Sequence, residues 1–314
     1  MDNIAVLIPC YNEENTIEKV IEEFKKNIPG SVIYVYDNNS TDSSVEKARN
    51  AGAIVRYEKR QGKGNVIRRM FREVEAEIYI MVDADDTYPA EAATALIEKI
   101  EDGADMAVGD RLNGTYFTEN KRRFHNSGNT FVRKSINWLF HNSIKDIMTG
   151  YRAFSYRFVK TFPVLSHGFE IETEMSIHAV DKNLAVENVI IDYQDRPEGS
   201  ESKLNTVSDG MKVLRTIARL FRCYQPQKFF GAIAALLLII SLLFFVPILC
   251  TYFADGLVPR FPTLVVCGFT ALAAVQCFFA GMQLQNIVQK NKQDFEMQLQ
   301  HAMKEQREAH EETH

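Results

Sequence analysis

Two long apolar segments constrain what this chain can fold into more than any other feature of its sequence. Residues Phe229 to Phe253 are 25 consecutive positions without a charged side chain, and Thr263 to Leu284 are 22 more. A helix needs about 20 apolar residues to cross a bilayer, and the connector Ala254 to Pro262 has nine residues. We therefore predict two transmembrane helices joined as a hairpin within residues 229–288, at about 229–253 and 263–286. A buried hairpin in a soluble protein is the alternative.

Basic residues are distributed unevenly around this hairpin. The connector holds one, Arg260, whereas seven stand at the outer ends: Lys212, Arg215, Arg219, Arg222, Lys228, Lys290 and Lys292. Because cytoplasmic flanks of membrane helices carry the excess of Lys and Arg, both termini are predicted to be cytoplasmic. Residues 206–228 alternate basic and apolar positions at helical spacing, which predicts an amphipathic helix in the membrane interface. Residues 289–314 would then form a cytoplasmic C-terminal tail.

The N-terminal two thirds of the chain has the pattern of an α/β domain, predicted over residues 1–205. Apolar strand-like runs occur at Ile4–Ile8, Val32–Tyr36, Ile54–Tyr57, Ile78–Val82 and Met106–Val108, and helical periodicity separates them. This order predicts a Rossmann-like, mostly parallel sheet with helices on both faces. The overall composition, with 46% hydrophobic residues and a net charge of −5, excludes a disordered chain and gives no sign of nucleic-acid binding.

Polar clusters follow the strands at the edge where ligands of parallel sheets bind. They are Pro9–Glu14, Asp37–Asp42 and Asp83–Asp86, and Gln61–Asn65 opens a helix nearby. Asp83 and Asp85, two residues apart at a strand end, are suited to a hard divalent ion that also bridges phosphates. Acidic residues also favour helix N-termini, which is the alternative explanation. Together the clusters indicate a nucleoside-diphosphate site, although neither a P-loop nor a complete dinucleotide fingerprint is present.

These motifs resemble those of GT-A glycosyltransferases of family 2. The matching pieces are Pro9-x-Tyr11-Asn12-Glu13-Glu14, Asp37-Asn38-x-Ser40-x-Asp42, Gly62-Lys63-Gly64 and Asp83-x-Asp85. The resemblance extends to the polyprenyl-phosphate glycosyltransferases, similar to dolichol-phosphate mannose synthase, through Gly109-Asp110-Arg111, Arg123-x-x-x-Ser127, Thr149-Gly150-Tyr151-Arg152, Gly168-Phe169-Glu170-Ile171-Glu172-x-Glu174 and Arg196-x-x-Gly199-x-x-x-Lys203. Many bacterial members end in two transmembrane helices, so the resemblance implies a protein of the cytoplasmic (inner) membrane.

The resemblance also implies roles for individual residues. It assigns donor binding to Pro9, Tyr11, Glu13, Asp37, Lys63 and Asp83. It assigns the binding of Mg²⁺ or Mn²⁺ to Asp83 and Asp85. It assigns catalysis to Asp85, Arg111, Arg196 and Lys203, whose charges would stabilise the phosphates during transfer. Binding of the acceptor phosphate falls to Arg123, Ser127 and Arg152, and a supporting role to Glu174. One position departs from the pattern: Thr87 stands where relatives often have a Gln that helps to bind the metal.

The activity that the resemblance implies is inverting, metal-dependent transfer of a sugar from a nucleotide donor to polyprenyl (undecaprenyl) phosphate. The resemblance to bacterial members favours UDP-glucose or UDP-N-acetylglucosamine, with GDP-mannose as the alternative. A polysaccharide synthase is less favoured, because Trp138 lacks the Q-x-x-R-W context and two spans are too few for a pore. A non-catalytic membrane scaffold is disfavoured by the intact Asp83 and Asp85. The sequence leaves the oligomeric state open.

Overall fold

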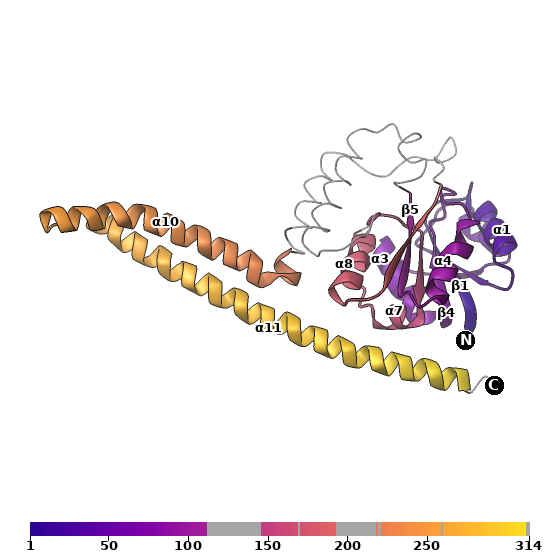
Figure 1. Cartoon of the computed structure of the whole chain (residues 1–314). Helices are drawn as coiled ribbons and strands as arrows, with labels where there is room; N and C mark the ends of the chain where they lie inside the picture. Colours follow the sequence, from indigo (N-terminus) through magenta and orange to yellow (C-terminus); the bar gives the residue numbers. More distant parts are fainter. Residues whose placement is uncertain (112–145, 169, 193–217, 219–220, 259, 312–314) are drawn as a thin grey trace. The chain divides into compact units, whose positions relative to one another are not determined.

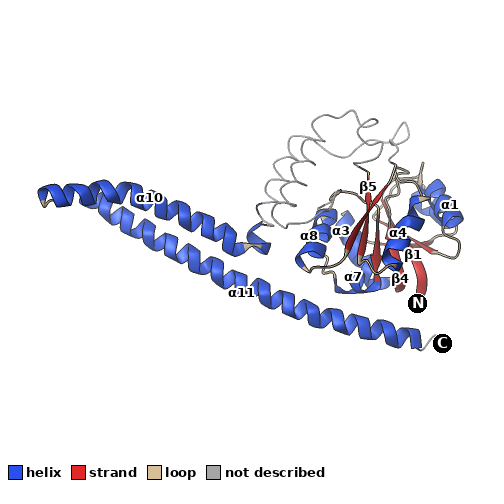
Figure 2. Cartoon of the chain, viewed as in Figure 1, coloured by secondary structure: helices blue, strands red, loops and turns tan. Residues whose placement is uncertain are grey.

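The computed structural model describes residues 1–111, 146–168, 170–192, 218, 221–258 and 260–311 (Figures 1 and 2). The chain divides into two compact units. The first comprises Met1–Gly210 together with Phe295–His314, and the second comprises Met211–Asp294. Most of the predicted amphipathic helix at 206–228 lies outside the described residues, so that helix stays a prediction.

A seven-stranded sheet forms the centre of the first unit, and its strands run in the order β3-β2-β1-β4-β6-β5-β7. The strands are β1 (Asp2–Cys10), β2 (Val32–Asp37), β3 (Ile54–Tyr57), β4 (Ala76–Met81), β5 (Met106–Asp110), β6 (Arg152–Ser155) and β7 (Val186–Ile190). All pairings are parallel except those of β6 with β4 and β5. The predicted mostly parallel α/β sheet is confirmed.

Helices follow the strands because their apolar residues recur at helical spacing and face the sheet. They are α1 (Ile17–Asn27), α2 (Ser44–Asn50), α3 (Lys63–Glu73), α4 (Ala92–Glu101), α7 (Tyr156–Thr161) and α8 (Ile171–Asp181). In α1, for example, Val20, Ile21 and Phe24 are buried while the residues between them are exposed or half-buried. Such a stripe packs on one face of the sheet.

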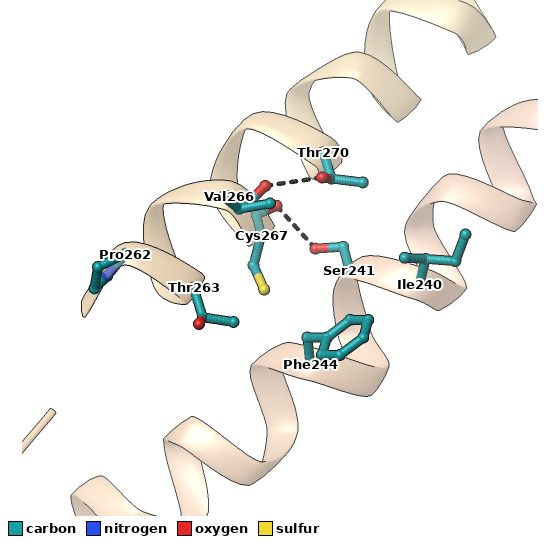
Figure 3. Close-up of a pocket in the computed structure, with 8 residues that line it drawn as sticks. All are labelled: Ile240, Ser241, Phe244, Pro262, Thr263, Val266, Cys267 and Thr270. Carbon is teal, nitrogen blue, oxygen red and sulfur yellow. Dashed lines mark hydrogen bonds between the residues drawn. The ribbon is translucent and has the colours of Figure 1, made fainter. Parts of the chain in front are cut away.

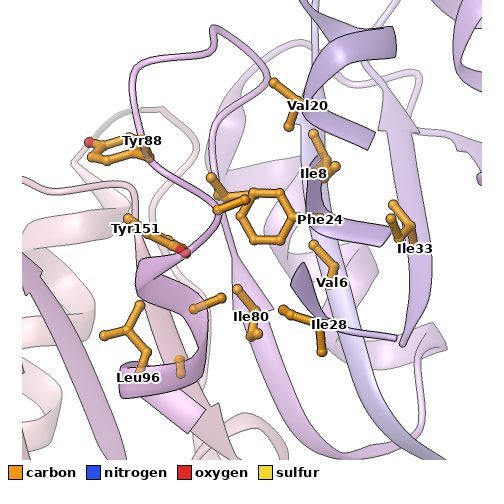
Figure 4. Close-up of a cluster of buried hydrophobic side chains, with 14 of the residues drawn as sticks. Val6, Ile8, Val20, Phe24, Ile28, Ile33, Ile80, Tyr88, Leu96 and Tyr151 are labelled. Carbon is orange, nitrogen blue, oxygen red and sulfur yellow. The ribbon is translucent and has the colours of Figure 1, made fainter. Parts of the chain in front are cut away.

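The core lies where α1 and α4 cover β1 and β4 (Figure 4). Val6 and Ile8 of β1 and Ile80 of β4 are fully buried. Phe24 of α1 meets Tyr151 edge-on, with ring centroids 6.0 Å apart. This packing fixes the carboxyl ends of the central strands, where the polar clusters begin.

Strand β6 is an element that the sequence pattern did not predict. It enters the sheet antiparallel between β4 and β5, with Arg152 opposite both Met81 and Val108. Because the two strands run in opposite directions, the residues just before Arg152 lie beside those just after Met81. The sheet register therefore brings the Thr149–Tyr151 segment against the acidic segment that follows β4.

The second unit consists mainly of two long apolar helices, α10 (Pro226–Asp255) and the first part of α11 (Phe261–Glu311). Both are long and apolar enough to cross a membrane. Large apolar side chains point outward, with Leu243 67%, Phe253 77% and Phe269 69% exposed. The pair therefore offers two candidate membrane spans, as predicted, while the side on which each terminus lies stays a prediction.

The two apolar helices contact each other within the second unit. Ser241 Oγ of α10 donates a hydrogen bond of 2.9 Å to the main-chain oxygen of Cys267 in α11. Next to this bond, residues of both helices line a pocket of about 340 Å³, with Ile240 and Phe244 from α10 and Thr263 from α11 (Figure 3). A polar side chain that bonds across two apolar helices is a common device for holding membrane helices together.

The end of α11 belongs to the first unit and packs on it. Phe295 is 4% exposed, and its ring lies 5.3 Å from the ring of His178 in α8. The ammonium of Lys182 lies 5.5 Å from the centre of the Phe295 ring. Ala302, two turns further on, is also buried. The sequence predicted only a polar tail here, so its packing on α8 is a finding of the structure.

Candidate active site

The loops after β1 and β2 are tied together at the carboxyl edge of the sheet. The main-chain N–H of Asn12 donates to Ser40 Oγ at 2.9 Å, and that of Glu13 donates to Ser44 Oγ at 2.9 Å. In return, Thr41 N–H donates to Asn12 Oδ1 at 2.8 Å. Asn12 has a φ of 54°, a left-handed conformation that Asn tolerates better than most residues. Two of the predicted donor motifs are thus one structural unit.

The donor residues predicted in these loops differ in exposure. Tyr11 is 36% exposed, Pro9 and Glu13 are half-buried, and Asp37 is 3% exposed. The Asp37 carboxylate accepts the N–H of Ser40, which shapes the loop after β2. The structure brings all four residues to one edge of the sheet, and their contacts with a nucleotide stay predictions.

Asn38 has a structural task that motif matching did not assign. Its side-chain amide donates to the main-chain oxygens of Glu58 and Arg60 at 2.8 and 2.9 Å. Its side-chain oxygen accepts the N–H of Gly62 at 2.7 Å. Asn38 therefore holds the segment that leads into α3, and with it the position of Lys63.

Lys63 lies at the centre of the site. Its ammonium is 2.5 Å from Asp83 Oδ1 and 2.6 Å from Glu172 Oε1. Gly62 and Gly64 on either side of Lys63 let the start of α3 pack against residues 166–167, because a Cβ at either position would collide with the main-chain carbonyl of Ser166 or His167. In the sequence, Glu172 lies in a family motif but has no assigned role, and no local spacing connects it with Lys63.

Burial and charge pairing act against each other in this cluster. Burial lowers the pKa of Lys63, but the negative charges of Asp83 and Glu172 outweigh it and the pKa lies above its ordinary value. Burial raises the pKa of Glu172, and Lys63 opposes that rise. The charge of Asp83 adds to the rise for Glu172, whereas both carboxyl groups favour the charged form of Lys63, so the cluster is one cation placed between two carboxyl groups.

The acidic loop after β4 is held from several sides. Thr16 Oγ1 donates to the main-chain oxygen of Ala84 at 2.6 Å, and Lys19 pairs with Asp86 at 2.6 Å. Asp85 is 7% exposed, and Thr87, 2% exposed, donates its hydroxyl to Asp85 Oδ1 at 2.6 Å. Thr87, the position that departs from the family pattern, thus orients the carboxylate of Asp85.

This contact makes a prediction about Thr87. Thr87→Val keeps the shape of the side chain but removes the donor, so Asp85 loses the hydrogen bond that fixes its rotamer. Partners of this kind change metal affinity by about 10- to 100-fold, and we expect a loss of that order in nucleotide-dependent Mn²⁺ binding. Thr87→Ser keeps the hydroxyl and should bind Mn²⁺ as the wild type does. Wild-type Mn²⁺ affinity in Thr87→Val would show that the contact does not contribute to metal binding.

Arg111 closes the other side of the site. Its guanidinium pairs with the buried Asp146 at 2.7 Å and donates to the main-chain oxygen of Met148 at 3.0 Å. It also reaches the hydroxyl of Tyr88 at 3.4 Å, and that hydroxyl accepts the N–H of Gly150 at 3.1 Å. A Cβ on Gly150 would collide with the Asp83 carboxylate. Arg111 is therefore linked to the acidic loop through Tyr88 and Gly150.

Arg152, predicted to bind the acceptor phosphate, is fully buried. Its guanidinium donates to the main-chain oxygens of Thr149 and Ile147 at 3.0 and 2.7 Å, and to Ser176 Oγ at 2.9 Å. Burial lowers its pKa to about 10. In this structure Arg152 binds the loop before β6 to α8; contact with a phosphate stays a prediction.

The remaining predicted residues divide into two groups. Arg123, Ser127, Arg196 and Lys203 lie outside the described residues, and their roles stay predictions. Glu174 accepts the N–H groups of Leu165 and Ser166 at 3.2 and 2.8 Å. It thereby holds the segment whose carbonyls pack against Gly62 and Gly64. This contact suits the predicted supporting role without testing it.

The residues around Asp83 and Asp85 fit a divalent cation that is bound together with a diphosphate. Within the described ranges, no three carboxylate, imidazole or thiolate side chains converge on one point. Mg²⁺ and similar ions are commonly held by one or two carboxylates plus the phosphates of a substrate. The pair of carboxylates, one of them oriented by Thr87, supplies the protein's share of such a site.

Comparison with known proteins decides the family. A model described as glycosyl transferase family 2 matches residues 5–161, which is half of the chain. The glycosyltransferase AglJ of Haloferax volcanii is 30% identical over 233 residues, covering 74% of this chain and 76% of that protein. This chain belongs to glycosyltransferase family 2. It is a glycosyltransferase, and the family resemblance drawn from its motifs is confirmed.

Two further comparisons place this glycosyltransferase among its relatives. The dolichyl-phosphate hexose transferase of Haloferax volcanii is 26% identical over 219 residues, covering 70% of this chain and 94% of that protein. Glucosyl-3-phosphoglycerate synthase of Mycobacterium tuberculosis, solved with Mn²⁺, uridine diphosphate and phosphoglyceric acid, has a TM-score of 0.55 at 20% identity. The two structures align over 70% of this chain and 78% of the synthase chain, which shows that they share the GT-A fold.

Proposed function

We propose that this glycosyltransferase transfers a sugar from UDP-glucose or UDP-N-acetylglucosamine to polyprenyl phosphate, with inversion, giving a polyprenyl-monophosphate sugar. The observation that carries the proposal is the Lys63–Asp83 ion pair, with Asp85 in the same loop, at the ligand edge of a GT-A sheet in a chain with two candidate membrane spans. A relative named dolichyl-phosphate hexose transferase supports the lipid-phosphate acceptor.

The donor would bind along the carboxyl edge formed by the loops after β1, β2 and β4. Pro9, Tyr11, Glu13 and Asp37 would hold its base and ribose. Asp83 and Asp85 would hold Mg²⁺ or Mn²⁺ with the diphosphate, and Lys63 would face the same charge. When bound, the cation would supply Lewis-acid neutralisation of the leaving nucleoside diphosphate. A solved GT-A relative that contains Mn²⁺ and uridine diphosphate supports this assignment.

The acceptor would need no general base. A sugar hydroxyl must lose its proton to a base during transfer, whereas a lipid phosphate is already an anion at pH 7. Positioning and stabilisation of charge can then account for most of the catalysis. Arg111 is the described candidate for this task, and Arg123, Ser127, Arg196 and Lys203 are the proposed partners beyond the described residues.

Membrane sidedness is a separate prediction of this proposal. With Cys223 and Cys250, the exposed free cysteines, replaced, Arg307→Cys should react with an impermeant thiol reagent only when the cytoplasmic side is open. A matched probe, Leu257→Cys in the connector, should react from the outside, because Leu257 is 68% exposed. Cys10 adds no background, since burial raises the pKa of its thiol to about 12. Reaction of the Arg307 probe from the outside alone would reverse the topology.

The donor is tested by a panel with the purified full-length protein. UDP-glucose, UDP-N-acetylglucosamine and GDP-mannose are offered separately with a short polyprenyl phosphate, and the glycolipid is quantified. We expect one of the two UDP-sugars to give product. Product from GDP-mannose alone would replace the donor assignment, and a growing polysaccharide would favour a synthase. Nucleotide binding with no product from any donor would favour a scaffold.

A further inference from the structure

Glu172 is a buried carboxylate that contacts the donor-site lysine. It stands in the first turn of α8, and its side chain is 9% exposed. Its Oε1 atom lies 2.6 Å from Lys63 Nζ, and the side chain of that lysine is itself 7% exposed. The contact links residues 109 positions apart in the sequence. A buried charge pair of this kind requires an explanation, because burying ions is costly unless they are well paired.

Lys63 has a second carboxylate partner, which belongs to the candidate metal site. Asp83 Oδ1 is 2.5 Å from the same ammonium, and the Asp83 side chain is 25% exposed, so it borders the open edge of the sheet. Glu172 therefore lies deeper and Asp83 lies nearer to where the donor would bind. The two partners differ in what else they could contact.

The main chain at Glu172 is held by hydrogen bonds to residues other than Asp83. Ser176, one turn further along α8, donates to the main-chain oxygen of Glu172 at 3.0 Å and accepts from Arg152 at 2.9 Å. The positive charge of Arg152 also favours the ionised form of Glu172. This network holds the first turn of α8 in place whether or not Asp83 stays on Lys63.

We propose that Glu172 is a positioning residue that holds Lys63 by an ion pair independent of Asp83, so that Asp83 can turn to a nucleotide-bound divalent cation. The inference deepens the proposed function and rests on it. Without Glu172, an Asp83 that turned to the cation would take away negative charge from around the buried ammonium of Lys63 just as a second cation came near it. With Glu172 in place, Lys63 keeps a partner in both arrangements and remains directed at the donor edge.

The test is nucleotide-dependent Mn²⁺ binding by the full-length protein in detergent, followed by the electron paramagnetic resonance signal of free Mn²⁺ with UDP and with GDP. Glu172→Gln keeps the size of the side chain and removes its charge. We expect Mn²⁺–nucleotide affinity to fall by about 10- to 100-fold, as for other partners of ligand residues. The matched control is Glu170→Gln, an exposed position at the start of the same helix, which should bind as the wild type does.

A double-mutant cycle separates action through Lys63 from direct contact with the ligand. In a Lys63→Met background, Glu172→Gln should cause no further loss of affinity, because the lysine that it positions is absent. An equal loss in both backgrounds would mean that Glu172 touches the ligand itself, and wild-type affinity in Glu172→Gln would mean that it has no such task. Either result overturns the inference.

Two further outcomes keep the test decisive. If Glu172→Gln lacks a cooperative melting transition, Glu172→Asp takes its place, since it keeps the charge but shortens the reach toward Lys63; the same loss of affinity is expected, and wild-type affinity overturns the inference. If the wild type binds Mn²⁺ with neither nucleotide, the proposed function fails and takes the inference with it. Failure of the inference alone is recognised by normal binding in the wild type.

Discussion

Asp85→Asn is expected to lower the rate of sugar transfer by at least about a hundredfold while the protein stays folded. The substitution keeps the shape of the side chain and its ability to accept the hydroxyl of Thr87, which lies 2.6 Å away. It removes the negative charge that would bind the cation on the diphosphate. Losing one preorganised charge-stabilising group costs enzymes about 10²- to 10³-fold in rate. The rate is measured as glycolipid formed per minute at saturating donor, and folding by the melting temperature.

The neighbouring carboxylate provides a matched control. Asp86 pairs with Lys19 at 2.6 Å and has a φ of 57°, a conformation that Asn also tolerates. Asp86→Asn should therefore change the rate by less than about twofold, since Lys19, its partner, is 55% exposed and ion pairs that water reaches contribute little. A rate near that of the wild type in Asp85→Asn, or full activity in excess EDTA, would contradict metal binding at this loop.

Arg152→Leu is expected to cause the largest loss of stability. The guanidinium is fully buried and donates to two main-chain oxygens and to Ser176. Its removal leaves those oxygens without their donor, at about 1–3 kcal/mol for each buried group, and leaves the charges of Asp146 and Glu172 less well balanced. We expect a loss of about 3 kcal/mol or more, which corresponds to a melting temperature lower by roughly 6–12 °C for a unit of this size.

The control for this prediction is Arg72→Leu, an exposed position near the end of α3. Surface substitutions of this kind usually change stability by less than about 0.5 kcal/mol. Arg152→Lys separates charge from shape, because it keeps the charge but cannot reach all three acceptors. An Arg152→Leu protein that melts at the wild-type temperature would show that Arg152 does not hold the loop before β6 to α8.

Local patterns were sufficient to predict the parallel part of the fold. The runs at Ile4–Ile8 and Val32–Tyr36 became β1 and β2 with one or two more residues at their ends, and Ile54–Tyr57 is β3 as predicted. The helical periodicity between the first two of these runs became α1. These elements are readable because each buries its own apolar stripe, and the alternation of strand and helix then fixes a parallel order.

Features that depend on distant residues were not readable in the same way. The pattern did not identify β6, since four residues that include a fully buried Arg152 lack an apolar run. The contact of Glu172 with Lys63 joins two helices and has no spacing signal. Phe295 lies in the predicted C-terminal tail, and its burial against His178 follows from packing within the folded unit. In each case the partner is chosen by the fold.

Thr87 departs from the family pattern, and its contact with the acidic pair is visible only in the structure. In the sequence it placed the metal ligands in doubt, because a Gln is usual at that position. In the structure its hydroxyl orients Asp85. The position thus keeps a link to the acidic pair through a hydrogen bond to a carboxylate.

The central claim is that the acceptor is a lipid phosphate, and a competition among matched acceptors tests it most directly. The purified protein receives its preferred labelled nucleotide sugar with polyprenyl phosphate, with the polyprenol of the same length, or with a soluble phosphate such as 3-phosphoglycerate. The account predicts a labelled glycolipid from polyprenyl phosphate and no product above background from the other two. Transfer to the polyprenol or to the soluble phosphate at a comparable rate would contradict it.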